Sequence, residues 1–119
     1  MSRRRKDTGP TKAVAMLVHD RDDGACIVCG LYGHSAFLPH QLHHRRARGA
    51  GGSRLSDTNS PANLVTLCHT HHMQVESHRE NALAAGWLVR QGHDPALTPV
   101  IYHGRRVLLT HDGQIEDVA

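Results

Sequence analysis

NLVTLCHTHH, residues 63–72, runs from an apolar stretch directly into one cysteine and three histidines. Its apolar part, residues 64–67, has the length and composition of a short buried strand. We expect a helix to follow from about His69. Cys68 would then end the strand and His71 would lie one turn into the helix, so both side chains could face one metal ion. The stretch therefore predicts a strand–helix unit with a pair of metal ligands at its junction.

A second ligand pair with the same spacing, C-x-x-C, lies upstream at residues 26–29. Structural Zn²⁺ takes four sulfur or nitrogen ligands in a tetrahedron. We expect the two pairs to form one structural zinc site: Cys26, Cys29, Cys68 and His71. His69 and His72 compete with His71 for the fourth position. The alternative is a redox pair in the C-x-x-C with Cys68 as a core thiol, but such a pair normally opens a helix in a βαβ pattern, which this sequence lacks.

Two adjacent histidines, His43 and His44, end a predicted strand over residues 36–44. Neighbouring side chains of a strand point to opposite faces, so one imidazole can bind a metal ion while the other accepts a proton. His72 can supply a second metal ligand, and Asn63 can hydrogen-bond backbone or imidazole and fix the geometry. Phosphodiester hydrolysis needs a base for the attacking water and a cation near the developing negative charge. The pattern is therefore typical of metal-dependent phosphodiester hydrolysis.

Basic side chains form two clusters. One is RRRK at residues 3–6, within a segment over residues 1–10 that we expect to be a disordered basic arm. The other lies in an Arg- and Gly-rich loop over residues 45–60. Such clusters suit the phosphate backbone of nucleic acids, and the alternative is a solubilising tail with a solvated loop. We expect four arginines to contact DNA: Arg45, Arg46, Arg48 and Arg54.

The remaining sequence frames this centre. Residues 11–21 predict a helix capped by Thr11, a Ser77–Glu80 capping box predicts another that ends at Gly86, and residues 100–109 predict a hairpin. The 119 residues fit one domain. No apolar run reaches the roughly 18 residues of a transmembrane helix. The basic N-terminus lacks the apolar part of a secretory signal, so we expect a cytoplasmic protein without a membrane partner.

Together these motifs resemble the HNH nuclease family, which has a ββα-metal (His-Me finger) fold with a zinc-binding frame. The likeness is greatest to small HNH proteins of bacteriophages and prophages, and it covers roughly residues 20–92. It is carried by CIVC (26–29), LHHRR (42–46), GGS (51–53), DTNSPANL (57–64), CHTHH (68–72), VESHR (75–79) and GWLV (86–89).

The resemblance implies a divalent-metal-dependent DNA endonuclease that nicks or cuts DNA and leaves 5′-phosphate and 3′-hydroxyl ends. His44 would be the general base, Asn63 the orienting residue, and His43 and His72 the ligands of one catalytic ion such as Mg²⁺ or Mn²⁺. Many phage members are encoded beside terminase genes and assist genome packaging. The resemblance thus also implies the terminase large subunit as a partner and the bacterial host cytoplasm as the location.

The sequence departs from the family at His71, where a fourth zinc-binding cysteine is usual. Glu76 lies four residues after His72, on the same helix face, and is either a third ligand or a solvated side chain. We expect an α+β fold with an HNH domain over residues 11–92 and a C-terminal hairpin and tail over residues 93–119. The alternative function is a non-catalytic zinc module that binds nucleic acid or a packaging partner.

Overall fold

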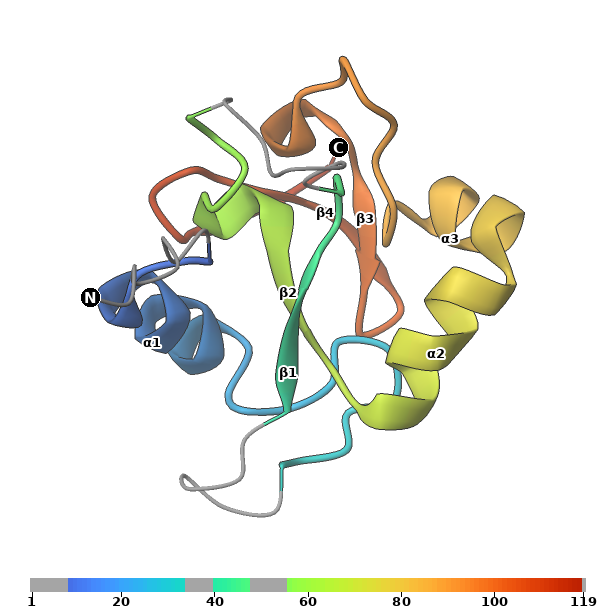
Figure 1. Ribbon diagram of the computed structural model, residues 1–119, viewed down its shortest axis with the longest axis horizontal. Helices are drawn as coiled ribbons and strands as arrows, with labels where there is room; N and C mark the ends of the chain where they lie inside the picture. The colour runs from blue at the N-terminus through green and yellow to red at the C-terminus, as the bar shows by residue number, and fades with distance from the viewer. Residues whose placement is uncertain (1–8, 34–39, 48–55, 119) are drawn as a thin grey trace, which may run out of the picture.

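The computed structural model describes residues 9–33, 40–47 and 56–118. Within them the chain has the expected α+β class, with three helices and two small antiparallel sheets (Figure 1). Most of the predicted basic arm, the strand residues 36–39, the GGS motif, Arg48 and Arg54 lie outside the described residues. The elements are α1 (Lys12–Arg21), β1 (Gln41–His44), the 3₁₀ turn η1 (Pro61–Asn63), β2 (Leu64–Leu67), α2 (His69–Ser77), α3 (Arg79–Ala85), the 3₁₀ turn η2 (Pro95–Leu97), β3 (Val100–Tyr102), β4 (Arg105–Leu109) and β5 (Ile115–Asp117).

Strands β1 and β2 pair antiparallel, and α2 follows β2 at once. In this register His43 lies opposite Val65 and His44 lies opposite Leu64. All four β2 residues are buried, as the apolar run predicts. The strand over 64–67 and the helix from His69 are therefore confirmed, and His43 of β1 lies near His72 in the first turn of α2.

Helix α1 matches its predicted bounds. The Thr11 side chain caps it by accepting a hydrogen bond from the Val14 amide at 3.2 Å. Asp22, directly after the helix, is buried, and its carboxylate accepts from the Thr66 amide at 3.0 Å and from the Tyr102 hydroxyl at 2.8 Å. The end of α1 is thus tied to β2 and to β3.

Helices α2 and α3 meet at His78, without the predicted capping box. The Ser77 hydroxyl donates to the Met73 carbonyl one turn back, and no side chain caps α3. Ser77 still has helical backbone in α2, so its hydroxyl bonds the preceding turn as mid-helix serines do. Gly86 ends α3 as predicted, with φ 77°. A Cβ there would lie 1.9 Å from the Pro99 carbonyl oxygen, so the close approach of these two segments requires glycine.

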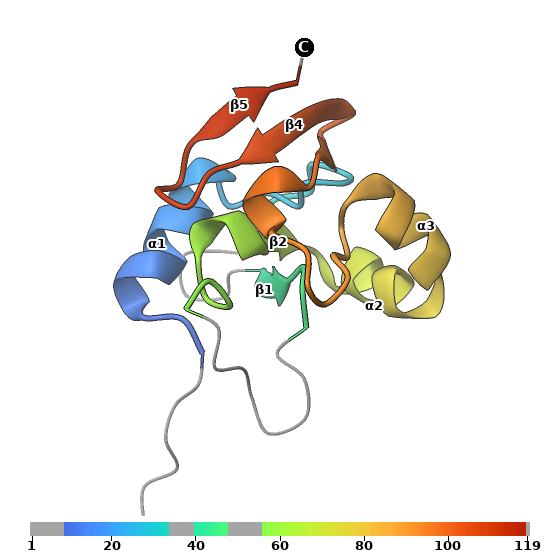
Figure 2. The same cartoon turned by 90° about the horizontal axis from the view of Figure 1, so that it is seen from above.

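The C-terminal hairpin is part of a larger sheet. β3 and β4 pair around His103 and Gly104, which have φ of 48° and 79°, as a tight hairpin turn between twisted strands requires. β5, which the sequence did not predict, adds to β4 (Figure 2). No described helix is long and apolar enough to cross a membrane.

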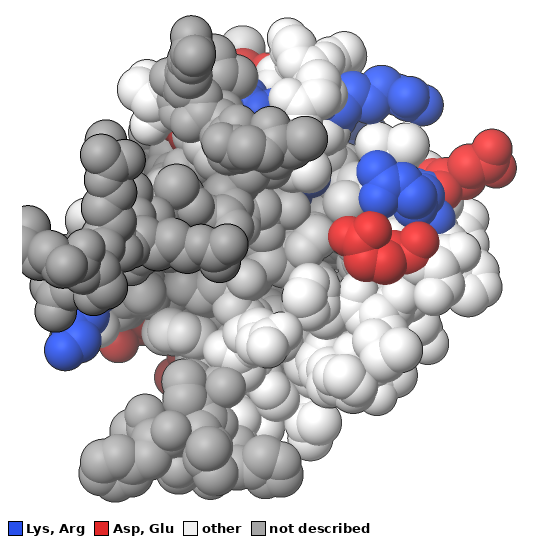
Figure 3. All heavy atoms as spheres, in the orientation of Figure 1, with Lys and Arg blue, Asp and Glu red and all other residues white. Residues whose placement is uncertain are grey.

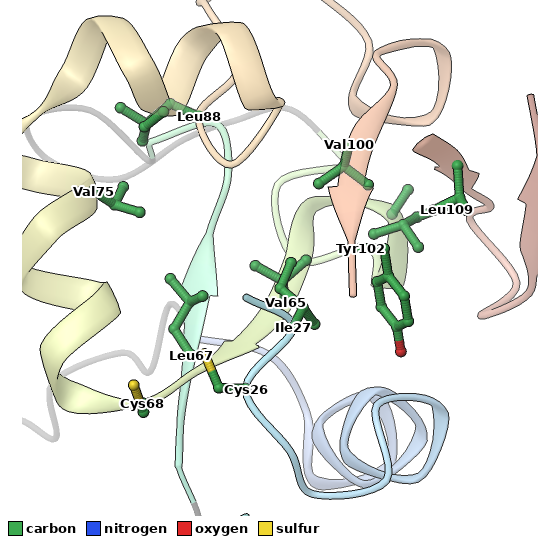
Figure 4. Packing of buried hydrophobic residues seen from close by; sticks show 13 residues of the cluster. Cys26, Ile27, Val65, Leu67, Cys68, Val75, Leu88, Val100, Tyr102 and Leu109 are labelled. Carbon is green, nitrogen blue, oxygen red and sulfur yellow. The ribbon is translucent and has the colours of Figure 1, made fainter. Parts of the chain in front are cut away.

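One hydrophobic core joins the two sheets and the helices. Leu67 of β2 packs with Val75 of α2 and with Leu88 after α3, while Val100 and Leu109 belong to the same cluster from the C-terminal sheet (Figure 4). Cys26 and Cys68 lie at one edge of this cluster. The core therefore holds the C-x-x-C turn and the β2–α2 junction against each other.

Candidate metal centre and histidine site

The two predicted ligand pairs come together in space. The ligand atoms of Cys26, Cys29, Cys68 and His71 all lie within 4.8 Å of one another. The Cys29 and Cys68 sulfurs are 3.8 Å apart, and the His71 Nδ1 lies 3.7 Å from the Cys26 sulfur and 3.2 Å from the Cys68 sulfur. Zn–S and Zn–N bonds imply tetrahedral edges of about 3.8 Å between sulfurs and about 3.5 Å between sulfur and nitrogen. The cluster could therefore hold a metal ion such as zinc.

Local backbone structure aims these side chains at one point. The Gly30 amide donates to the Cys26 carbonyl at 2.8 Å, and Gly30 has φ 76°, which closes the turn between the first two cysteines. Cys68 is the N-cap residue of α2, so His71 follows one turn into the helix. The same helix carries His72, whose amide donates to the Cys68 carbonyl at 2.9 Å. The metal cluster thus borders the histidine site directly.

The thiols of the cluster respond to burial and to each other. Burial opposes ionisation of Cys26, but backbone amides that donate to its sulfur, first among them that of Cys29, outweigh this and lower its pKa. Burial raises the pKa of Cys68, and the negative charge of Cys26 raises it further. A metal cation between the two sulfurs would favour both thiolates, because metal ligands bind in the deprotonated form.

His43 and His72 face each other across β1 and α2. Their ring centroids are 5.3 Å apart. His43 is buried, its Nε2 donates to the Trp87 carbonyl at 2.8 Å, and burial lowers its pKa to about 4, so the ring is neutral at pH 7. The His72 Nδ1 donates to the Gln41 side-chain carbonyl at 3.1 Å. Among the described residues, the groups of three or more ligands that could hold a metal ion do not include this pair.

Glu76, on α2, carries the third candidate ligand group. Its side chain is 57% exposed and accepts a hydrogen bond from Arg79 at 2.9 Å. This exposure and the pairing with Arg79 favour a solvated Glu76 side chain over a third metal ligand, the two alternatives that the sequence left open.

His44 lies on the opposite face of β1, as the alternation along a strand predicts. It is half-buried, and its Nε2 donates to the Asn59 side-chain carbonyl at 2.8 Å. Sequence reasoning missed Asn59, although it stands in the DTNSPANL motif. Asn63 is fully buried and bonds only backbone among the described residues: it accepts from the Arg46 amide at 2.7 Å and donates to the Thr58 carbonyl at 2.8 Å. Asn63 therefore fixes the chain on both sides of the 48–55 segment.

The guanidinium groups of Arg45 and Arg46 are buried in the fold, which argues against their expected role as DNA contacts. Arg45 is 0% exposed, and its guanidinium donates to four backbone carbonyls, those of Ala62, Gly86, Pro95 and Thr98, at 2.7–2.9 Å. Burial lowers its pKa to about 9, so it remains charged at neutral pH. Arg46 is 3% exposed, pairs with Asp57 and donates to the His93 carbonyl at 2.8 Å. Both arginines stabilise the fold around the site.

A second group of described ligands could also hold a metal ion: Asp57, Asp94 and His111. Each already has a partner. Arg46 pairs with Asp57 and lowers its pKa, the Ala96 amide donates to Asp94 at 2.8 Å, and the Ser60 hydroxyl bonds His111. These contacts explain the group as a hydrogen-bond network that holds three loops together.

Comparisons of the chain with family models, with curated proteins and with solved structures give no match. The assignment of a function therefore depends on the site itself.

Proposed function

We propose that this protein is a divalent-metal-dependent DNA endonuclease of the HNH type. The observation that carries the proposal is the His43–His72 pair across β1 and α2, with His44 on the other face of the same strand beside Asn59. A ββα unit with two imidazoles on one face and a third on the other supplies the ligand and base positions that metal-assisted phosphodiester hydrolysis needs.

Each histidine has a hydrogen bond that indicates which ring nitrogen would serve in the proposed role. The Nε2 of His43 donates to Trp87, which leaves Nδ1 as its ligand atom, and the Nδ1 of His72 donates to Gln41, which leaves Nε2. A divalent ion held there would stabilise the negative charge that develops on the phosphate. His44 donates through Nε2 to Asn59, so Nδ1 carries the lone pair that would accept the proton of the attacking water.

The Cys₃His cluster lies at the start of α2, in the same β1–β2–α2 unit. We propose that it binds a structural zinc ion that joins the residue 26–29 turn to the start of α2. Because His71 and His72 are neighbours in α2, this ion would hold the helix that carries a catalytic ligand. By resemblance, we further propose a phage origin, a role with the terminase large subunit in genome packaging, and action in the host cytoplasm.

The test is nicking of supercoiled plasmid by the zinc-loaded protein with Mg²⁺ or Mn²⁺. His44→Ala should lower the nicking rate by a factor of about 10²–10⁴ while the fold, the zinc content and the Kd for DNA stay unchanged. His72→Ala should lose activity through weaker metal affinity, so excess Mn²⁺ restores part of it. His69→Ala, an exposed histidine of the same helix, is the matched control and should nick like the wild type. Wild-type nicking by His44→Ala would remove His44 from the mechanism.

One observation favours a second function, a zinc module that binds nucleic acid without cutting it. The Cys₃His cluster has a complete ligand set, whereas His43 and His72 have no third ligand in the described groups. Absence of nicking by the wild-type protein with any divalent ion, together with retained DNA binding, would establish this alternative.

A further inference from the structure

A cleft opens beside His44, between the chain that follows β1 and the α2–α3 side of the molecule. It encloses about 420 Å³ and is lined by His44, Glu76, Arg79, Arg90 and Gln91, among others. The Val89 amide donates to the Arg45 carbonyl, and the Gln91 side chain donates to the Ala47 carbonyl, both at 2.7 Å. Residues 89–91 thus run beside residues 45–47 and form one wall of the cleft.

The cleft presents two guanidinium groups to solvent. Arg79 is 59% exposed and pairs with Glu76, whereas Arg90 is exposed and makes no ion pair with any described residue. Lys or Arg side chains lie beside Asp or Glu side chains on the α2–α3 side of the molecule (Figure 3). Both arginines therefore differ from Arg45 and Arg46, whose guanidinium groups are buried in the fold.

We propose that Arg79 and Arg90 hold the DNA phosphate backbone in the cleft beside His44; this inference rests on the endonuclease function proposed above. Arginine binds phosphate through two parallel hydrogen bonds. An exposed ion pair such as Arg79–Glu76 contributes little to stability, so Arg79 can exchange the carboxylate for a phosphate at low cost. The two arginines would bind the phosphate backbone along the cleft and would not touch the transferred proton.

The test compares two double variants with the same change in charge. Arg79→Gln/Arg90→Gln removes both cleft cations. Arg105→Gln/Arg106→Gln is the matched control on β4, since both residues are exposed and Arg105 pairs with Asp117 much as Arg79 pairs with Glu76. Binding of a labelled DNA duplex is measured by fluorescence anisotropy without divalent ions, between about 50 and 200 mM salt.

The slope of log affinity against log salt should be flatter by about 1.8 in the cleft variant, since each phosphate contact contributes about 0.9, and unchanged in the control. In plasmid nicking the cleft variant should raise KM and leave kcat near the wild-type value. Equal slopes for both variants and the wild type would overturn the inference, whatever the nicking result. A flatter slope for the cleft variant alone, with no nicking by the wild type, would keep the cleft as a DNA-binding surface and reject the nuclease.

Discussion

Replacing Arg45 by lysine should destabilise the protein strongly, although the charge and most of the side chain are retained. The Arg45 guanidinium uses four of its five N–H groups, because Nε donates to Gly86, one terminal nitrogen donates to Ala62 and Pro95, and the other to Thr98. These acceptors lie around a planar fork. A lysine ammonium has three donors on one atom and cannot reach all of them.

The magnitude follows from the bonds that are lost. A hydrogen bond to a charged group contributes about 1.5–3 kcal/mol net, and a buried carbonyl left without a donor costs about 1–3 kcal/mol. With one or two of the four bonds lost and imperfect geometry in the others, Arg45→Lys should lower the free energy of unfolding by about 2–4 kcal/mol. A small domain has only about 5–15 kcal/mol in total. Arg45→Ala loses all four bonds and leaves a cavity, and should not accumulate as folded protein.

The assay is equilibrium denaturation of the zinc-loaded protein in urea, with Arg90→Lys as the control. Arg90 is exposed, so its replacement should change the free energy of unfolding by less than about 0.5 kcal/mol. The comparison also separates a structural role of Arg45 from a role as a surface phosphate contact. A lysine in a surface phosphate contact would leave the free energy of unfolding unchanged. An Arg45→Lys protein within about 0.5 kcal/mol of the wild type would refute the structural role argued here.

Two further predictions concern protonation and metal. The pKa of His43 is about 4 in the folded protein against about 6.5 in the unfolded chain, so between these values the unfolded chain binds the additional proton. Stability therefore decreases as the pH is lowered, by about 2 kcal/mol from about pH 7.5 to about pH 5. In His43→Gln this difference in the free energy of unfolding between the two pH values should disappear. Protonation of the zinc ligands affects both proteins equally, so it cancels in the comparison. An identical pH dependence of the variant and the wild type would contradict the burial of His43. The purified protein should contain one zinc per chain, and Cys26→Ala should unfold it, since zinc contributes on the order of 10 kcal/mol in small modules; a folded protein with well under one zinc would reject the metal centre.

The parts of the fold that the sequence predicted are those encoded over a few neighbouring residues. The apolar run over residues 64–67 became β2, Thr11 capped α1, and Gly86 ended α3 in the left-handed conformation that favours glycine. The C-x-x-C and C-x-x-H spacings each place two ligands on one side of a turn, and the four ligands lie together in the structure. The contact between the distant segments 26–29 and 68–71 could be predicted because one zinc ion would need the ligands of both.

The arginines show why the rest was not predictable. In sequence, Arg45 and Arg46 stand beside a histidine pair in a basic loop, a pattern that also fits phosphate binding. Their acceptors are carbonyl oxygens and a carboxylate 11 to 53 residues away, and backbone carbonyls leave no mark in the amino-acid sequence. Conversely, Arg79 and Arg90 lie outside any basic cluster and reach the His44 cleft only because α3 turns the chain back along residues 45–47. Charge patterning along the chain thus pointed to the region of the cleft but could not show that Arg45 and Arg46 are buried, and burial decides which cation remains available to a ligand.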